Sequence, residues 1–163
     1  MKPWNEFMME DPELAGIGKK LLFPTRSQIG MAFLATLRKD GAPRLHPVSL
    51  VYHHACLYVL IPPPSPKCSD LKRDGRYALQ AYPPQNNMKY EEFYVARRAE
   101  WIQDATIRQA LIADIKIRIE VSEVLFELYL ERAMYTKLEN PNTSDEYPLH
   151  RKWCARSHDV KSI

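Results

Sequence analysis

Hydrophobic and polar residues alternate along several segments of the chain, the pattern of half-buried β-strands. The first such segment, 30–38, is largely apolar and is followed by Lys39-Asp40-Gly41, where Asp-Gly supplies the positive φ angles of a tight turn. A strand from Pro43 to Tyr52 is predicted to pair back on it. A turn at His53-His54-Ala55 then leads into a third strand, Cys56–Ile61.

Three further strands are predicted at 76–82, 91–102 and 121–138, with a turn-rich segment at 83–87. A helix is an alternative for 121–138, but its period of two and its aromatic residues favour a strand. Hairpin-connected strands with short helices indicate an antiparallel sheet that closes on itself. The predicted fold class is therefore mainly β, a small barrel with peripheral helices.

The helices are predicted from their capping residues. Asp11-Pro12 opens one that ends at Pro24, Ser65-Pro66 opens one at about 66–73 with Gly75 as its C-terminal cap, and Asp104 caps one that reaches about Ala113. Residues 1–9 are expected to be an irregular arm. Residues 139–163 are expected to be a polar loop and a tail that carries Trp153.

The bulk composition suits one soluble domain over residues 1–163. The chain is 45% hydrophobic and 26% charged, with a net charge of +3 that is too small and dispersed to indicate nucleic acid. Three widely spaced cysteines indicate no disulfide framework or zinc site. The acidic N-terminus does not resemble a signal peptide, and no apolar run is long enough to cross a membrane, so the cytoplasm is expected.

The candidate chemistry lies between Arg44 and Lys67. On a strand, Arg44, His46 and Val48 point to one face, so a cation, an imidazole and an apolar contact share a direction. Ser65 is a good N-cap and Lys67 lies in the first helical turn, where free N–H groups and the helix dipole favour phosphate. A solvated lysine and an outward polar strand face are the alternatives. The combination predicts a phosphate-bearing cofactor between the strand and the helix start.

The adjacent histidines His53 and His54 suggest a metal site only weakly. No carboxylate or cysteine lies at ligand spacing, and neighbouring side chains on a strand or tight turn diverge. Solvated turn histidines are therefore expected, and no metal ligand is assigned.

A series of short motifs, in order over roughly residues 14–112, resembles the pyridoxamine 5′-phosphate oxidase-like family of FMN-binding split barrels. The motifs are Phe33-Leu34-Ala35-Thr36, Asp40-Gly41-Ala42-Pro43-Arg44, His46-Pro47-Val48, Leu57-Tyr58-Val59, Ser65-Pro66-Lys67, Asp70-Leu71-Lys72-Arg73-Asp74-Gly75-Arg76-Tyr77-Ala78-Leu79, and Phe93-Tyr94-Val95 before Arg98-Ala99.

The resemblance implies an antiparallel Greek-key split β-barrel that forms a homodimer with flavin sites at the interface. Arg44, Ser65 and Lys67 match positions that hold the FMN phosphate, and Leu60 and Ile61 match residues that offer backbone contacts. The positions of His46-Pro47-Val48 match the strand along the isoalloxazine edge. The implied protein is a flavin-dependent oxidoreductase acting on a small molecule, with no catalytic acid or base assigned.

The chain departs from the enzymes that oxidise vitamin B6 phosphate. Ser49 stands where they have a lysine, and Arg97 stands where relatives often have glycine. Three alternatives on the same fold stay open: a deazaflavin-dependent reductase, a haem-binding protein with His150 or His158 as ligand, and a cofactor-free dimeric binding module.

Overall fold

The computed structural model of the protein describes residues 1–25, 27–82, 90–115 and 122–155. In these residues the elements are α1 (Trp4–Glu10), α2 (Pro12–Leu22), β1 (Ile29–Leu37), β2 (Pro43–His53), β3 (Cys56–Ile61), α3 (Pro66–Arg73), β4 (Arg76–Ala81), β5 (Glu91–Ile102), α4 (Ala105–Ile115), β6 (Val124–Glu139) and β7 (Tyr147–Cys154). The predicted turn at 83–87, Val121 and His158 lie outside the described residues. Among the described helices, none is long and apolar enough to cross a membrane.

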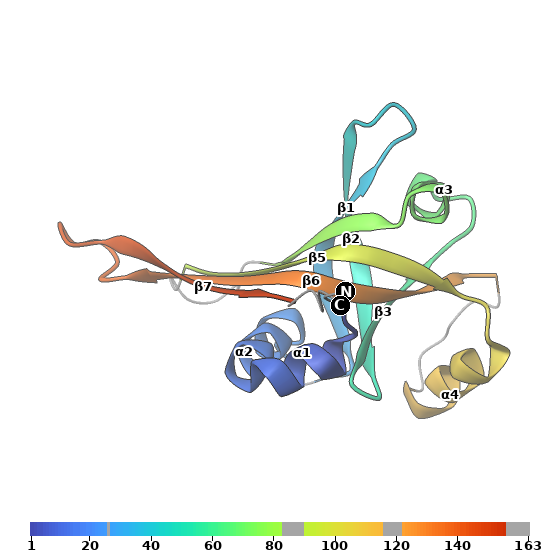
Figure 1. Ribbon diagram of the computed structural model, residues 1–163, viewed down its shortest axis with the longest axis horizontal. Helices are drawn as coiled ribbons and strands as arrows, with labels where there is room; N and C mark the ends of the chain where they lie inside the picture. The colour runs from blue at the N-terminus through green and yellow to red at the C-terminus, as the bar shows by residue number, and fades with distance from the viewer. Residues whose placement is uncertain (26, 83–89, 116–121, 156–163) are drawn as a thin grey trace, which may run out of the picture.

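The strands form one antiparallel sheet in the order β3-β2-β1-β4-β5-β6-β7. A further pairing of β3 with β6, from Tyr58 opposite Glu127 to Ile61 opposite Val124, closes six strands into a barrel. β7 stays at the sheet edge and continues the β6 ribbon away from the barrel (Figure 1). The predicted mainly β antiparallel barrel with peripheral helices is confirmed.

The β1–β2 hairpin forms where Asp-Gly predicts it. Gly41 has a φ of 83°, a conformation that costs glycine nothing, and its N–H donates to the carbonyl of Arg38 over 3.0 Å. The Asp40 carboxylate accepts from the N–H of Ala42. The turn sets the register in which Leu34 lies opposite His46, and this places the polar residues of β2.

The N-terminal residues differ from the predicted irregular arm, because residues 4–10 form α1. Its first residue follows Pro3, and no side chain caps it, so the local sequence carries a weak signal. Trp4 and Phe7 are fully buried, and the ring of Phe7 lies 4.6 Å from that of Trp153. Tertiary burial therefore stabilises this short helix.

α2 begins as predicted, with the Asp11 carboxylate accepting from the N–H of Leu14 over 3.0 Å. α1 and α2 lie side by side at one side of the barrel (Figure 1). The predicted role of Gly75 as a helix cap is wrong, because its φ is not in the left-handed region that such a glycine adopts, and α3 ends with the N–H of Asp74 donating to the carbonyl of Asp70. Gly75 is needed for another reason, since a Cβ there would lie 2.5 Å from the carbonyl oxygen of Ala99.

The expected loop and tail at 139–163 contain regular structure. β6 runs to Glu139, and residues 147–154 form β7, which pairs with it from Tyr147 opposite Glu139 to Cys154 opposite Arg132. Trp153 is buried and its indole N–H donates to Glu10 over 3.0 Å. The last strand therefore packs against α1.

α4 packs on the outside of the barrel through a small apolar cluster separate from the main core. Leu111 is its fully buried residue, in contact with the cluster formed by Val51, Tyr58 and Leu125. The cap predicted at Asp104 is confirmed, because its carboxylate accepts from the N–H of Thr106 over 2.8 Å. This packing brings the helix to the lower end of the β2–β3 hairpin (Figure 1).

Candidate functional site

The start of α3 is built by the end of β3 and a stiff proline loop. The N–H of Ser65 donates to the carbonyl of Pro62, and Ser65 is the N-cap residue, as predicted. Its hydroxyl caps no backbone N–H, however, and instead accepts from the Lys67 ammonium over 2.9 Å. A cation and a hydroxyl therefore lie together at the positive end of the helix dipole, where an anion is favoured.

Arg44 is tied to α3 by a buried carboxylate. Its Nε donates to Asp70 over 2.7 Å, and the hydroxyl of Thr36 donates to the same oxygen over 3.0 Å. Burial raises the pKa of Asp70, but the hydrogen bonds from Arg44, Thr36 and Arg73 lower it by more, so the carboxyl stays ionised. Sequence reasoning gave Asp70 and Thr36 no role. The sequence does carry a signal for Asp70, because it is an acid on the same side of a short helix as the apolar residues Cys68 and Leu71.

A surface groove of about 600 Å³ runs along this arrangement. Its lining combines four cations with two carboxylates: Arg38, Lys39, Asp40, Arg44, Pro64, Pro66, Ser69, Asp70 and Arg73. Arg44 and the two prolines that flank Ser65 therefore face the same groove. A groove with a positive balance at a helix start suits an anionic ligand.

The predicted alternation of β2 is confirmed by burial. Arg44 and His46 are half-buried and Val48 is buried in the core, whereas Leu45 and Pro47 are exposed. The Nε2 atom of His46 is buried and has no hydrogen-bond partner among the described residues. Buried polar atoms are nearly always paired, so a ligand that offers a partner to this nitrogen fits the site.

Leu60 and Ile61 lie on β3 opposite Leu125 and Val124 of β6. Ile61 is fully buried in the core, and Leu60 packs against the smaller cluster beneath α4. Their side chains are therefore occupied by packing, and a ligand at this strand end would meet their backbone.

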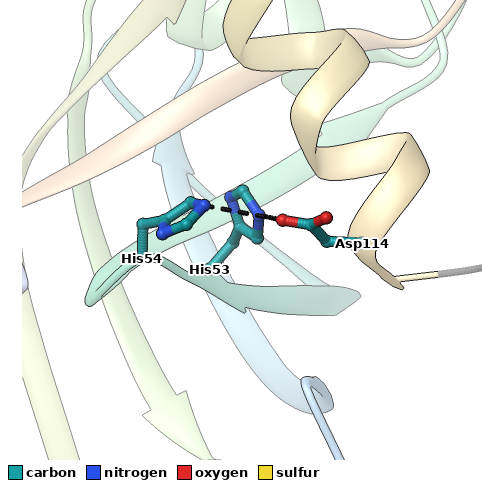
Figure 2. Close-up of side chains that lie close together, drawn as sticks. All are labelled: His53, His54 and Asp114. Atoms are coloured by element: carbon teal, nitrogen blue, oxygen red, sulfur yellow. Dashed lines mark hydrogen bonds and ion pairs between the residues drawn. The ribbon is translucent and has the colours of Figure 1, made fainter.

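Only one of the two adjacent histidines is solvated as predicted: the side chain of His54 is 75% exposed. His53 is only 4% exposed, and its Nε2 lies 2.8 Å from Asp114 of α4; the Nε2 of His54 lies 3.5 Å from the same oxygen (Figure 2). The expectation of solvated histidines is wrong for His53. The carboxylate that the local sequence lacked comes from a distant helix.

Comparison with known proteins finds no matching protein-family model and no matching curated protein. Solved structures do match. An F420 reductase has a TM-score of 0.53 and 17% identity, over 71% of this chain and 94% of that chain. HutZ, the haem storage protein of Vibrio cholerae, has a TM-score of 0.57 and 17% identity, over 74% of this chain and 89% of that chain.

A haem-binding protein from Mycobacterium smegmatis has a TM-score of 0.54 and 12% identity, over 81% of this chain. The match spans 56% of that protein's length. At these identities the similarity establishes the fold. The chain thus carries a barrel fold that is also found in an F420 reductase and in haem-binding proteins.

Proposed function

We propose that this protein binds FMN and places its phosphate at the start of α3. The observation that carries the proposal is the Lys67 ammonium held on Ser65 at a helix N-terminus without a side-chain cap. Backbone N–H groups, the helix dipole and the Lys67 ammonium then converge on a single point. The unpaired Nε2 of buried His46 gives a second polar contact that a flavin ring edge could satisfy.

Arg44 is the second phosphate ligand of the proposal. Its bond to Asp70 uses Nε, and a guanidinium carries further N–H donors on its two terminal nitrogens. Asp70 would thus orient the guanidinium toward the groove that it shares with Pro64 and Pro66. The isoalloxazine would lie along His46-Pro47-Val48, with backbone contacts at Leu60 and Ile61.

The proposed activity is a flavin-dependent oxidoreduction of a small molecule, in a homodimer whose second copy completes each flavin site. FMN would supply the electron transfer, while this chain holds and orients it. The F420 reductase among the structural matches supports a redox role on this fold. The haem-binding matches support the rival cofactor, haem, and deazaflavin binding is the nearer variant of the same site.

The test is the ultraviolet–visible spectrum of the full-length protein before and after addition of FMN and desalting. A retained two-band oxidised-flavin spectrum supports the proposal. A single deazaflavin-like band, an intense haem band after reconstitution, or no retained chromophore contradicts it and favours the matching alternative.

The Lys67→Ala variant tests the site itself. We expect its FMN affinity to fall about 10- to 100-fold, because a charge-assisted hydrogen bond contributes about 1.5–3 kcal/mol, while fold and dimer are retained. The exposed Lys20 of α2 supplies the control, and Lys20→Ala should bind FMN like the wild type. Full FMN affinity in Lys67→Ala would refute the phosphate site.

A further inference from the structure

A second group of polar side chains converges outside the barrel, between the β2–β3 turn and the last turn of α4. One ring nitrogen of His53, one ring nitrogen of His54 and a carboxylate oxygen of Asp114 all lie within 4.8 Å of one another. Figure 2 shows both imidazoles turned toward the carboxylate, which comes from the facing helix. The group is independent of the proposed flavin site.

Packing explains why residues so far apart in sequence meet here. Val51 and His53 point to the same face of β2, and Leu111 and Asp114 lie one turn apart on the same side of α4. The contact of Leu111 with the Val51 cluster therefore sets Asp114 over His53. The buried apolar cluster acts as the rigid support of the polar group.

The turn between β2 and β3 has an unusual backbone for its residues. His54 has a φ of 48° and Ala55 a φ of 58°, a left-handed pair for which such hairpins prefer Asn-Gly. This conformation brings the two imidazole rings to a centroid distance of 4.0 Å, at 73° to each other. A histidine kept in a strained position beside a second histidine is the kind of outlier that indicates a function.

The electrostatic setting also favours a cation. Asp114 lies in the last turn of α4, where the negative end of the helix dipole disfavours a carboxylate. The hydrogen bond from His53 lowers the pKa of Asp114, so the carboxylate is ionised at neutral pH. Two imidazoles and one carboxylate form a donor set typical of zinc and related divalent metals.

We propose that His53, His54 and Asp114 bind a divalent transition metal ion such as Zn²⁺, which joins the β2–β3 hairpin to α4. Tetrahedral zinc, with bonds of about 2.0–2.1 Å, separates its ligand atoms by about 3.3 Å. The 3.5 Å between His54 and Asp114 already fits, and the 2.8 Å between His53 and Asp114 must lengthen slightly. The half-exposed side chain of Asp114 can rotate to lengthen this distance. The fourth coordination position of the metal would face solvent.

Coordination of the metal changes the tautomer of His53. With Asp114 ionised, Nε2 of His53 carries the proton of their hydrogen bond. Coordination of the metal at Nε2 requires this proton to move to Nδ1, so the imidazole stays neutral and both Nε2 and the carboxylate are free to bind the ion. No change of redox state is involved.

The experiment uses untagged, full-length protein that has been treated with a chelator and then titrated with Zn²⁺ by calorimetry. We expect one zinc ion per chain and a higher melting temperature when zinc is present, because the ion binds the folded state. Asp114→Asn removes the charged ligand and keeps its shape. His54→Asn removes an imidazole at a left-handed position that asparagine tolerates, so this variant should fold at least as well as the wild type.

Each of these two variants should lose zinc affinity by about 100-fold or more, since even the partners of metal ligands are worth about 10- to 100-fold. His150→Ala is the control, because His150 is an exposed histidine on β7 that bonds to Thr136. It should bind zinc like the wild type. No zinc binding by the wild type, wild-type affinity in either site variant, or loss of binding in His150→Ala would each overturn the proposed site.

Discussion

Asp70 is the single residue that connects the barrel to the helix of the proposed phosphate site. It is almost fully buried, yet it carries a charge that Arg44, Thr36 and Arg73 together stabilise. A buried carboxylate of this kind contributes to stability only while its partners remain and while it stays ionised. Both conditions can be tested.

We expect Asp70→Asn to lower the free energy of unfolding at pH 7 by about 1.5–3 kcal/mol, the usual value of hydrogen bonds to a charged group. The folded pKa of Asp70 is lowered, so its contribution is complete above the unfolded value of about 3.9 and is lost as the pH falls through the folded value. Urea unfolding at pH 7 and at several values below pH 4 measures both effects.

Asp40→Asn is the matched control, because Asp40 lies in the same groove with 58% of its side chain exposed. Asparagine also suits the turn that contains Asp40, so we expect a change within about 0.5 kcal/mol. An Asp70→Asn variant as stable as Asp40→Asn would show that the buried network contributes nothing net.

At the scale of elements, α2 offers two glycines with opposite expected behaviour. A Cβ at Gly16 would meet no atom within 4 Å, whereas at Gly18 it would lie 2.2 Å from the ring of Phe93. Gly16→Ala should stabilise the protein by about 0.5–1 kcal/mol through helix propensity. Gly18→Ala should destabilise it by about 1–3 kcal/mol through overpacking, despite the same gain in propensity.

Denaturant midpoints of the two variants and the wild type provide the measurement. Both substitutions add one methyl group to the same helix. The difference between their free energies of unfolding therefore isolates the contact of residue 18 with Phe93 of β5. Equal stabilisation by both would mean that α2 does not pack against Phe93 as described.

Elements with strong local signals could be predicted from the sequence. The Asp11 cap of α2, the Asp-Gly turn after β1 and the alternating burial of β2 all follow from near neighbours. α1 and β7 could not be predicted in this way. The first is held by the burial of Trp4 and Phe7, and the second is an edge strand that contains Pro148 and has mostly exposed residues.

The contacts of the candidate sites also differ in whether local sequence could predict them. Ser65 and Lys67 are neighbours in sequence, so their meeting at the start of α3 was predictable. Asp70 and Arg44 meet only because α3 packs against the barrel wall. Asp114 meets His53 only because α4 packs on the small outer cluster. Spacing rules describe ligands within one element and carry no information about such contacts.

At the scale of the whole molecule, the outer surface of the β1–β2 hairpin is largely apolar. Every outward-facing residue of β1 is apolar: Ile29, Met31, Phe33, Ala35 and Leu37. Beside them on β2, Leu45 is 64% exposed, and Met31 of β1 is 46% exposed. Large apolar side chains that are exposed on one face of a sheet typically mark an interface. We propose that a second copy of the chain covers it in the homodimer.

We therefore expect light scattering after gel filtration to give twice the chain mass of 19.0 kDa for the wild type. Leu45→Asp should shift the protein toward the monomer, because it buries a charge on each side of the interface without a partner. Met9→Asp is the control, since Met9 is a 73% exposed residue on α1, and it should remain dimeric. A monomeric wild type would refute the dimer, and a dimeric Leu45→Asp would place its interface elsewhere.

The same variant links the dimer to the cofactor. Leu45 lies between Arg44 and His46 but points to the opposite face of β2, so its replacement leaves both proposed flavin contacts in their own chain. If the flavin site needs both copies, monomeric Leu45→Asp should lose FMN along with the dimer. If it keeps FMN at wild-type affinity, one chain holds the cofactor alone. Lys67→Ala, which should lose FMN and stay dimeric, separates loss of the phosphate contact from loss of the partner.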